Sequence, residues 1–157
     1  MNGPQHKFAN VCTGIFLTAT TYLIFQREDL MLAAAIGSAI GTTVTPDFDL
    51  DKDLPRSIFS KIPVVAVFWG MMWWPYQKLV KHRSWVSHSP LVSTVIRLLY
   101  MLFWFCLIVL AGNLIGLFYV NLGGVFWLVA DNFEFFATLF FCWVVQDLVH
   151  LWLDFVV

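Results

Sequence analysis

Histidine and aspartate recur in four separate stretches of this sequence, and the side chains of both are ligands for divalent metal ions. Imidazole and carboxylate suit zinc, manganese, iron or magnesium, whereas a set without thiolates disfavours copper(I). Eight candidates exceed the ligands of one tetrahedral zinc, so we expect zinc, with room for more than one ion. The candidate ligands are His6, Asp47, Asp49, His82, His88, Asp147, His150 and Asp154.

The last three candidates carry the sharpest signal. Asp147, His150 and Asp154 are offset by three and seven residues, which places them on one face of a helix. An ionisable residue in a membrane-spanning helix costs about 2.5–3.5 kcal/mol on insertion scales, so such residues are usually paired and functional. We therefore expect the three side chains to point into a helix bundle. The alternative is a helix that ends early and leaves them in water.

The acidic run at 47–53 offers carboxylates at the end of an apolar stretch. It is not an EF-hand loop, because Lys52 stands where glycine is needed and Ile58 where the bidentate glutamate belongs. Pro46 ends the preceding helix, so Asp47 and Asp49 follow at the membrane edge. A metal role for these two is favoured there, with a solvated acidic loop as the alternative.

A polar segment at 82–90 lies between two apolar runs. His82 and His88 are six residues apart and do not share a helical face, so we expect them to straddle a turn. Basic side chains that could hold a phosphate beside a metal are Lys81, Arg83 and Arg97. A serine nucleophile with a histidine base is a weaker alternative, since no G-x-S-x-G, P-loop or H-E-x-x-H motif is present.

The composition places these residues in a membrane protein. The chain is 60% hydrophobic and only 12% charged, against about 25% charged in soluble domains. Its apolar surface must therefore meet lipid. A net charge of -1 without a basic block gives no nucleic-acid signal. A length of 157 residues predicts one membrane-embedded domain over 1–157.

Four apolar stretches approach the roughly 20 residues that a membrane helix needs, at 8–25, 30–45, 90–120 and 133–157. A fifth, at 58–80, is bracketed by Pro63 and Pro75 and is rich in tryptophan, which prefers the headgroup level. We read it as interfacial or re-entrant, with full spanning as the alternative. The fold class is thus all-α: a polytopic helix bundle of about four spans plus one interfacial or re-entrant helix.

Antiparallel spans bring all the candidate ligands to one side of the membrane. We expect a single site there, provided that 58–80 does not span straight and carry His82 to the face opposite Asp47. The positive-inside rule makes this side the cytoplasmic face of the inner or cell membrane. Its basic residues are Lys7, Lys52, Arg56, Lys61, Lys78, Lys81 and Arg83, whereas the opposite loops hold Arg27 alone.

Four ordered motifs also resemble a known pattern: His6; Pro46-Asp47-x-Asp49; Trp74-Pro75-Tyr76 followed by His82-Arg83 and Ser87-His88-Ser89-Pro90; and His150-x-x-x-Asp154. With them the chain resembles, over most of its length, the predicted metal-binding membrane proteins of an uncharacterised bacterial family. It is similar, more distantly, to the LexA-regulated membrane-bound predicted metal-dependent hydrolases. Those hydrolases have glycine where this chain has Ser84, and threonine where it has Ser87.

The more distant resemblance implies an activity. The hydrolase family has been linked to zinc-dependent phospholipase C and single-strand nucleases, which implies phosphodiester hydrolysis, lipids among the substrates. Paired metal ions suit such chemistry, because one activates water while the other stabilises the leaving oxygen. The leading interpretation is therefore a metal-dependent phosphoester hydrolase at the cytoplasmic membrane face. The alternatives are a non-catalytic metal-binding membrane protein and a metal or proton transporter, which Asp147 near mid-helix would favour.

Overall fold

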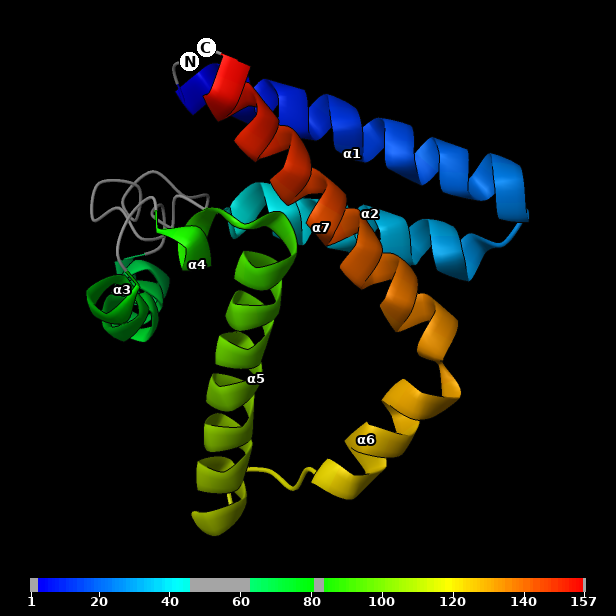
Figure 1. Cartoon of the computed structure of the whole chain (residues 1–157). Coiled ribbons are helices and arrows are strands. Elements are labelled where there is room, and N and C mark those ends of the chain that lie inside the picture. The colour runs from blue at the N-terminus through cyan, green and yellow to red at the C-terminus, as the bar shows by residue number, and fades with distance from the viewer. Residues whose placement is uncertain (1–2, 46–62, 81–83, 157) are drawn as a thin grey trace.

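The computed structural model describes residues 3–45, 63–80 and 84–156 of the chain. These residues form helices joined by short turns, and no strand occurs among them (Figure 1). The helices are α1 (Gly3–Phe25), α2 (Glu28–Thr43), α3 (Pro63–Leu79), α4 (Trp85–His88), α5 (Pro90–Leu114), α6 (Leu122–Asp131) and α7 (Phe133–Val156).

The long helices spread out from one end of the molecule. In Figure 1 the start of α1 and the end of α7 are drawn at the same end of the molecule, and the last turn of α2 and the first turn of α5 lie on the same side of it. From there α1 and α2 run as a hairpin in one direction, α7 crosses them, and α5 runs in another. The hairpin turn is tight, and Gln26 adopts a positive φ of 52°. We call the end of the molecule where α1 starts and α7 ends the polar end, because α7 carries Asp147, His150 and Asp154 toward it.

Small residues on α2 allow the central contact, which is the packing of α2 against α7. A Cβ atom added at Gly37 would lie 2.1 Å from the Leu139 carbonyl oxygen, and one at Gly41 would lie 2.5 Å from the Gln146 Cβ. Close backbone approach of this kind is how membrane helices associate, since apolar side chains gain little by leaving lipid. α2 packs against α1 as well as against α7.

Among the residues that the structure describes, three helices are long and apolar enough to cross a membrane: Phe8–Phe25, Pro90–Leu114 and Phe133–Val156. Many large apolar side chains on them are exposed, as a lipid-facing surface requires. The all-helical fold with membrane-length helices is therefore confirmed, but the count of four spans is not. α2 has 16 residues, which is roughly 24 Å of helix against about 30 Å of hydrocarbon.

Two segments differ from or refine the predicted elements. The stretch expected at 90–120 ends as a helix at Leu114, because Gly116 takes a positive φ of 68° and turns the chain. A further short apolar helix, α6, follows after Asn121, whose side chain accepts from the Gly123 amide at 3.0 Å. The helical part of 58–80, α3, is seen end-on in Figure 1 and so runs across α5 rather than alongside it.

An aromatic cluster joins α3 to α5. The Tyr100 ring lies 5.2 Å from Trp73 and 5.3 Å from Tyr76, measured between ring centroids. The Tyr100 hydroxyl also donates a hydrogen bond to the Met72 carbonyl. Trp73 is fully buried in this cluster. The inner face of α3 is therefore fixed against α5, while the face that carries Trp74 stays exposed.

Candidate metal centre at the polar end of the bundle

The polar stripe of α7 points inward over most of its length. Asp147 is completely buried and His150 is 3% exposed, which confirms the inward orientation predicted for these two side chains. Asp154, one turn further along, reaches the end of the bundle, and its side chain is 29% exposed. The stripe thus leads from the buried interior to the edge of the protein.

Asp147 is half of a buried ion pair. Its Oδ2 atom accepts hydrogen bonds from the Arg97 guanidinium and from the Thr94 hydroxyl, both on α5. Neither Arg97 nor Thr94 is exposed. Taking two charges out of water is costly, and their attraction offsets that cost only where further hydrogen bonds satisfy both groups. The pair is therefore a fixed feature of the packed interior that holds α5 against α7.

Arg97 has partners on every side. Its Nη1 donates to the Val44 carbonyl at the end of α2, and its Nε donates to the Ser93 carbonyl at 3.3 Å. The guanidinium also lies 5.6 Å from the centroid of the Trp143 ring, within the range of a cation–π contact. With Nη2 on Asp147, each guanidinium nitrogen has a protein acceptor. This arrangement does not favour the phosphate contact that the sequence predicted for Arg97.

His150 is paired with a carboxylate. Its Nε2 lies 3.4 Å from Oδ2 of Asp154, four residues along α7. Metal-binding histidines usually hold one ring nitrogen on a carboxylate, carbonyl or water, which fixes the ring and leaves the other nitrogen for the metal. The donor chemistry of this pair therefore fits a metal centre, with Asp154 either as a ligand or as the residue that orients His150.

The other candidates are placed only in part. His6 belongs to the first turns of α1, and His88 is the last residue of α4, just before α5 begins. The start of α1 lies at the polar end, whereas α4 lies next to the start of α5 (Figure 1). Asp47, Asp49, Lys81, His82 and Arg83 lie outside the described residues, so the single-site prediction stays a prediction. Within 3–45, 63–80 and 84–156, no group of three or more potential ligand residues is close enough to hold a metal.

α4 shows how the polar segment before α5 is shaped. Ser84 caps this single turn, and its Oγ accepts a hydrogen bond from the Ser87 amide at 3.3 Å. The Ser87 hydroxyl donates to the Ser84 carbonyl at 3.1 Å, and the residue is fully buried. These local bonds hold Ser87 within the turn that ends at His88. Pro90 then starts α5 in its favoured first position.

Several polar residues near the site were not singled out from the sequence. The Gln146 Nε2 donates to the Asn10 carbonyl at 3.0 Å, and both residues are buried where α7 meets α1. Ser38 of α2 is buried close to them, because Gly14 leaves room for both Ser38 and Gln146. Thr94 and Gln146 could have been singled out from the sequence, because each, like Asp147, is a polar residue inside an apolar run.

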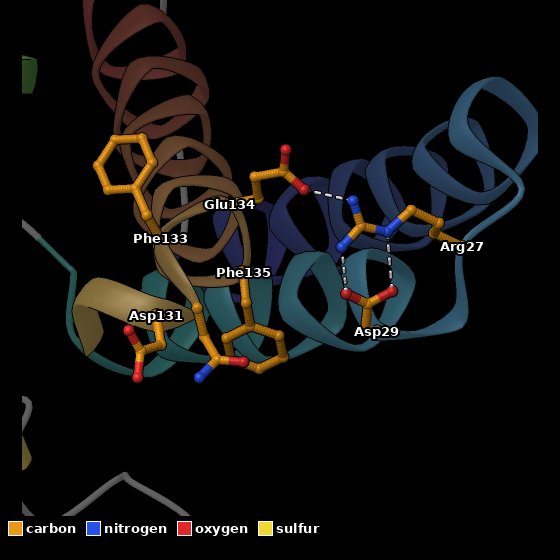
Figure 2. A pocket seen from close by; sticks show the side chains of 7 residues that line it. Arg27, Asp29, Asp131, Phe133, Glu134 and Phe135 are labelled. Atoms are coloured by element: carbon orange, nitrogen blue, oxygen red, sulfur yellow. Dashed lines mark hydrogen bonds and ion pairs between the residues drawn. The ribbon is translucent and has the colours of Figure 1, made fainter. Parts of the chain in front are cut away.

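A second charged cluster lies at the opposite end of the α1–α2 hairpin (Figure 2). The Arg27 Nη2 lies 2.7 Å from Asp29 Oδ2, and Nη1 binds Glu134 at the start of α7. The Asp29 and Glu134 carboxylates raise the pKa of Arg27, and the guanidinium lowers the pKa of Asp29. With Asp131 these residues line a cleft of about 280 Å³. All are exposed, so this cluster joins the hairpin to α7 only weakly.

Fold and site together define a class: an all-helical protein with membrane-length helices, a buried ion pair and a histidine–aspartate pair at one end. The chain belongs to the family described as "Uncharacterized metal-binding protein (DUF2227)", whose model matches residues 1–157. No curated protein and no solved structure matches the chain. The family confirms the metal-binding part of the resemblance seen in the sequence. It names neither the metal nor an activity, and it does not bear on the LexA-regulated hydrolases.

Proposed function

We propose that this chain is a membrane-embedded domain that binds divalent metal at the polar end of its helix bundle and uses it to hydrolyse a phosphoester. One observation carries the proposal. His150 is buried and its Nε2 lies 3.4 Å from Asp154 Oδ2, toward the end of α7 that lies near the start of α1 (Figure 1). His6 belongs to the first turns of α1, and the proposal adds it to this pair as a ligand from a separate part of the chain.

The donor set favours zinc. Histidine and carboxylate ligands without thiolate suit zinc among the common divalent ions, and a family of metal-binding proteins contains the chain. Without Asp147, which is bound to Arg97, seven of the eight candidate ligands remain, and these exceed what one zinc requires, so the proposal includes a second ion. When bound, such an ion would lower the pKa of a water molecule and polarise a phosphoryl oxygen. Arg83 and Lys81, next to His82 in the sequence, are the basic residues proposed to hold the phosphate.

The proposed topology has four spans, with α2 as the fourth and α3 at the interface. α2 packs against α1 and α7, which are both of membrane length, and this supports its place among the spans. The exposed outer face of α3, its position across α5 and its Lys78 near the C-terminal end suit a helix lying at the headgroup level. The excess of lysine and arginine on the polar-end side supports a cytoplasmic site in the cell membrane.

A non-catalytic metal-binding role is the second candidate. The family description supports it directly, since it states metal binding without an activity. A metal there would tie the helix ends together and extend what the Arg97 network already does in the interior. A transporter is less supported, because Asp147, the mid-helix carboxylate that favoured it, is bound to Arg97 and Thr94.

Hydrolysis of a chromogenic phosphodiester in mixed micelles tests the proposal. Zinc-loaded wild-type protein should turn over the probe, and a chelator or His150→Ala should abolish turnover. Asp131→Ala, a change at the opposite end of the bundle, serves as the control and should leave the rate within about twofold of wild type, as expected for a surface substitution. Metal binding without turnover would refute the hydrolase and support the non-catalytic metal-binding role. Turnover that survives the chelator would refute metal-dependent catalysis.

A further inference from the structure

Three buried polar side chains meet where α1, α2 and α7 pack together. They are Asn10 of α1, Ser38 of α2 and Gln146 of α7, and none is more than 4% exposed. The Gln146 Nε2 donates to the Asn10 main-chain carbonyl at 3.0 Å. The side-chain oxygens of all three residues have no hydrogen-bond partner among the residues that the structure describes. Unpaired polar groups are costly inside an apolar bundle, so three of them at one junction call for a common partner.

The Ser38 hydroxyl is not used as helical hydroxyls commonly are. Serine and threonine inside a helix often donate to the carbonyl four residues earlier. Thr18 of α1 and Thr42 of α2 do so, at 2.8 and 2.9 Å. The Ser38 hydroxyl makes no such bond and lies instead beside Gly14 of α1, because a Cβ atom added at Gly14 would lie 3.6 Å from the Ser38 Oγ. The hydroxyl therefore faces the neighbouring helix.

Gly14 keeps space open between these polar groups. A Cβ atom there would lie 3.0 Å from the Ser38 Cβ and 3.1 Å from the Gln146 Nε2. Asn10 is four residues before Gly14 and thus lies on the same face of α1, one turn away. The position that a single carbon would fill is therefore bordered by polar side chains of α2 and α7, with that of α1 one turn along.

We propose that a buried water molecule binds beside Gly14 and links the three helices. Water can donate to the Asn10 Oδ1 and the Gln146 Oε1 and accept from the Ser38 hydroxyl, which matches the two acceptors and one donor at the junction. Buried waters typically make about three hydrogen bonds of this kind. A cation is disfavoured, because the three side chains are neutral and its charge would stay uncompensated. The water site uses none of the candidate metal ligands and is independent of the proposed function.

Magnetisation transfer from water to the Gln146 side-chain amide tests the site directly. Deuterated, nitrogen-15-labelled protein in deuterated micelles should show this cross-peak with opposite signs in NOE and ROE spectra, which distinguishes a bound water from proton exchange. Gly14→Ala should lose the cross-peak, because its Cβ takes the space beside Gln146. Gly70→Ala is the matched control and should keep it, since a Cβ at Gly70 meets nothing within 4 Å. Ser38→Ala should also keep it, because the water retains two acceptors.

A thermodynamic cycle between α1 and α2 is the second readout. Asn10→Ala and Ser38→Ala should be coupled in SDS-induced unfolding, with the double variant's unfolding constant at least about threefold from the product of the single effects. Thr18→Val with Thr42→Val is the control pair. These hydroxyls bond within their own helices, so their effects should multiply to within about twofold.

Each result bears on the water site. A wild type without the cross-peak would overturn it, and so would a cross-peak that persists in Gly14→Ala, because the water would then lie elsewhere. A cross-peak lost in Ser38→Ala would trace the signal to the hydroxyl proton and not to water. Independent effects of Asn10→Ala and Ser38→Ala would show that the two residues share no bridging molecule. If Gly14→Ala does not fold, the wild type, Ser38→Ala and the cycle still decide.

Discussion

Replacing one partner of the Arg97–Asp147 pair should lower the free energy of unfolding more than replacing both partners together. Arg97→Met leaves the Asp147 carboxylate buried with only the Thr94 hydroxyl, and it leaves the Val44 carbonyl without its donor. Asp147→Leu leaves a buried guanidinium on two backbone carbonyls. Removing one partner of a buried pair typically costs 3–5 kcal/mol, because an uncompensated charge remains. Each single variant should therefore lower the free energy of unfolding by roughly 4 kcal/mol.

The double variant should be more stable than either single variant. Replacing a buried pair by apolar residues of similar volume is often neutral or stabilising. Here one group stays unsatisfied, the Val44 carbonyl, and a buried acceptor without a partner costs about 1–3 kcal/mol. Once Asp147 is replaced, the Thr94 hydroxyl can donate to the Pro90 carbonyl, 2.5 Å away, so it adds no further cost. The double variant should thus lose roughly 2 kcal/mol, about half of either single loss.

Reversible unfolding of the wild type, both single variants and the double variant in mixed micelles of increasing SDS content measures this cycle. Ser93→Ala reports what a buried substitution on α5 costs when no ion pair is touched, and it should stay within about 1 kcal/mol of wild type. Additive losses, with the double variant less stable than either single one, would show that the charges do not compensate each other. Single losses below about 1 kcal/mol would show that the pair is not buried as described.

Two further outcomes follow from the same structure. Gly37→Ala should destabilise the chain by about 1–3 kcal/mol in the same SDS assay, since its Cβ would lie 2.1 Å from the Leu139 carbonyl oxygen. Gly70→Ala is the control and should be neutral or slightly stabilising, because its Cβ meets nothing within 4 Å. Equal effects of the two substitutions would contradict the close α2–α7 contact. Arg27→Gln should raise the pKa of Asp29 back toward its ordinary value, seen by carboxyl NMR. The ion pair therefore stabilises the fold above the unfolded-state pKa of Asp29, and this contribution is lost as pH falls through the lowered value; an unchanged pKa would rule out the pairing.

Hydrophobic length predicted most of the helices. α1, α2 and α7 lie close to the stretches expected at 8–25, 30–45 and 133–157, because membrane-length apolar runs have few other stable forms. The break after Leu114 was missed because the surrounding residues stay apolar through the turn. Gly116 and the Asn121 cap were the local signals for it, and both are turn-type residues within a run assigned by hydropathy alone.

The sequence predicted which way the side chains of the candidate site point, but not which residue pairs with Asp147. The spacing of Asp147 and His150 indicated one inward face, and both are buried. The partner of Asp147 could not be chosen from sequence, because it depends on how α5 crosses α7. Arg97 was therefore read as a phosphate contact, whereas its fork closes on Asp147 and the Val44 carbonyl. A lone arginine inside a spanning helix is better read first as the partner of a buried acid.

Metal content is the most direct test of the central claim that the polar end binds a divalent ion. Protein purified from zinc-supplemented cells and dialysed should retain at least about one metal ion per chain, as a tetrahedral histidine–carboxylate site would. Asp154→Ala should lose that metal, because it removes the carboxylate on His150, whereas Asp131→Ala, an exposed aspartate at the far end, should keep it. Elemental analysis of the three proteins decides the matter. A wild type without metal, or equal content in all three, would contradict the account.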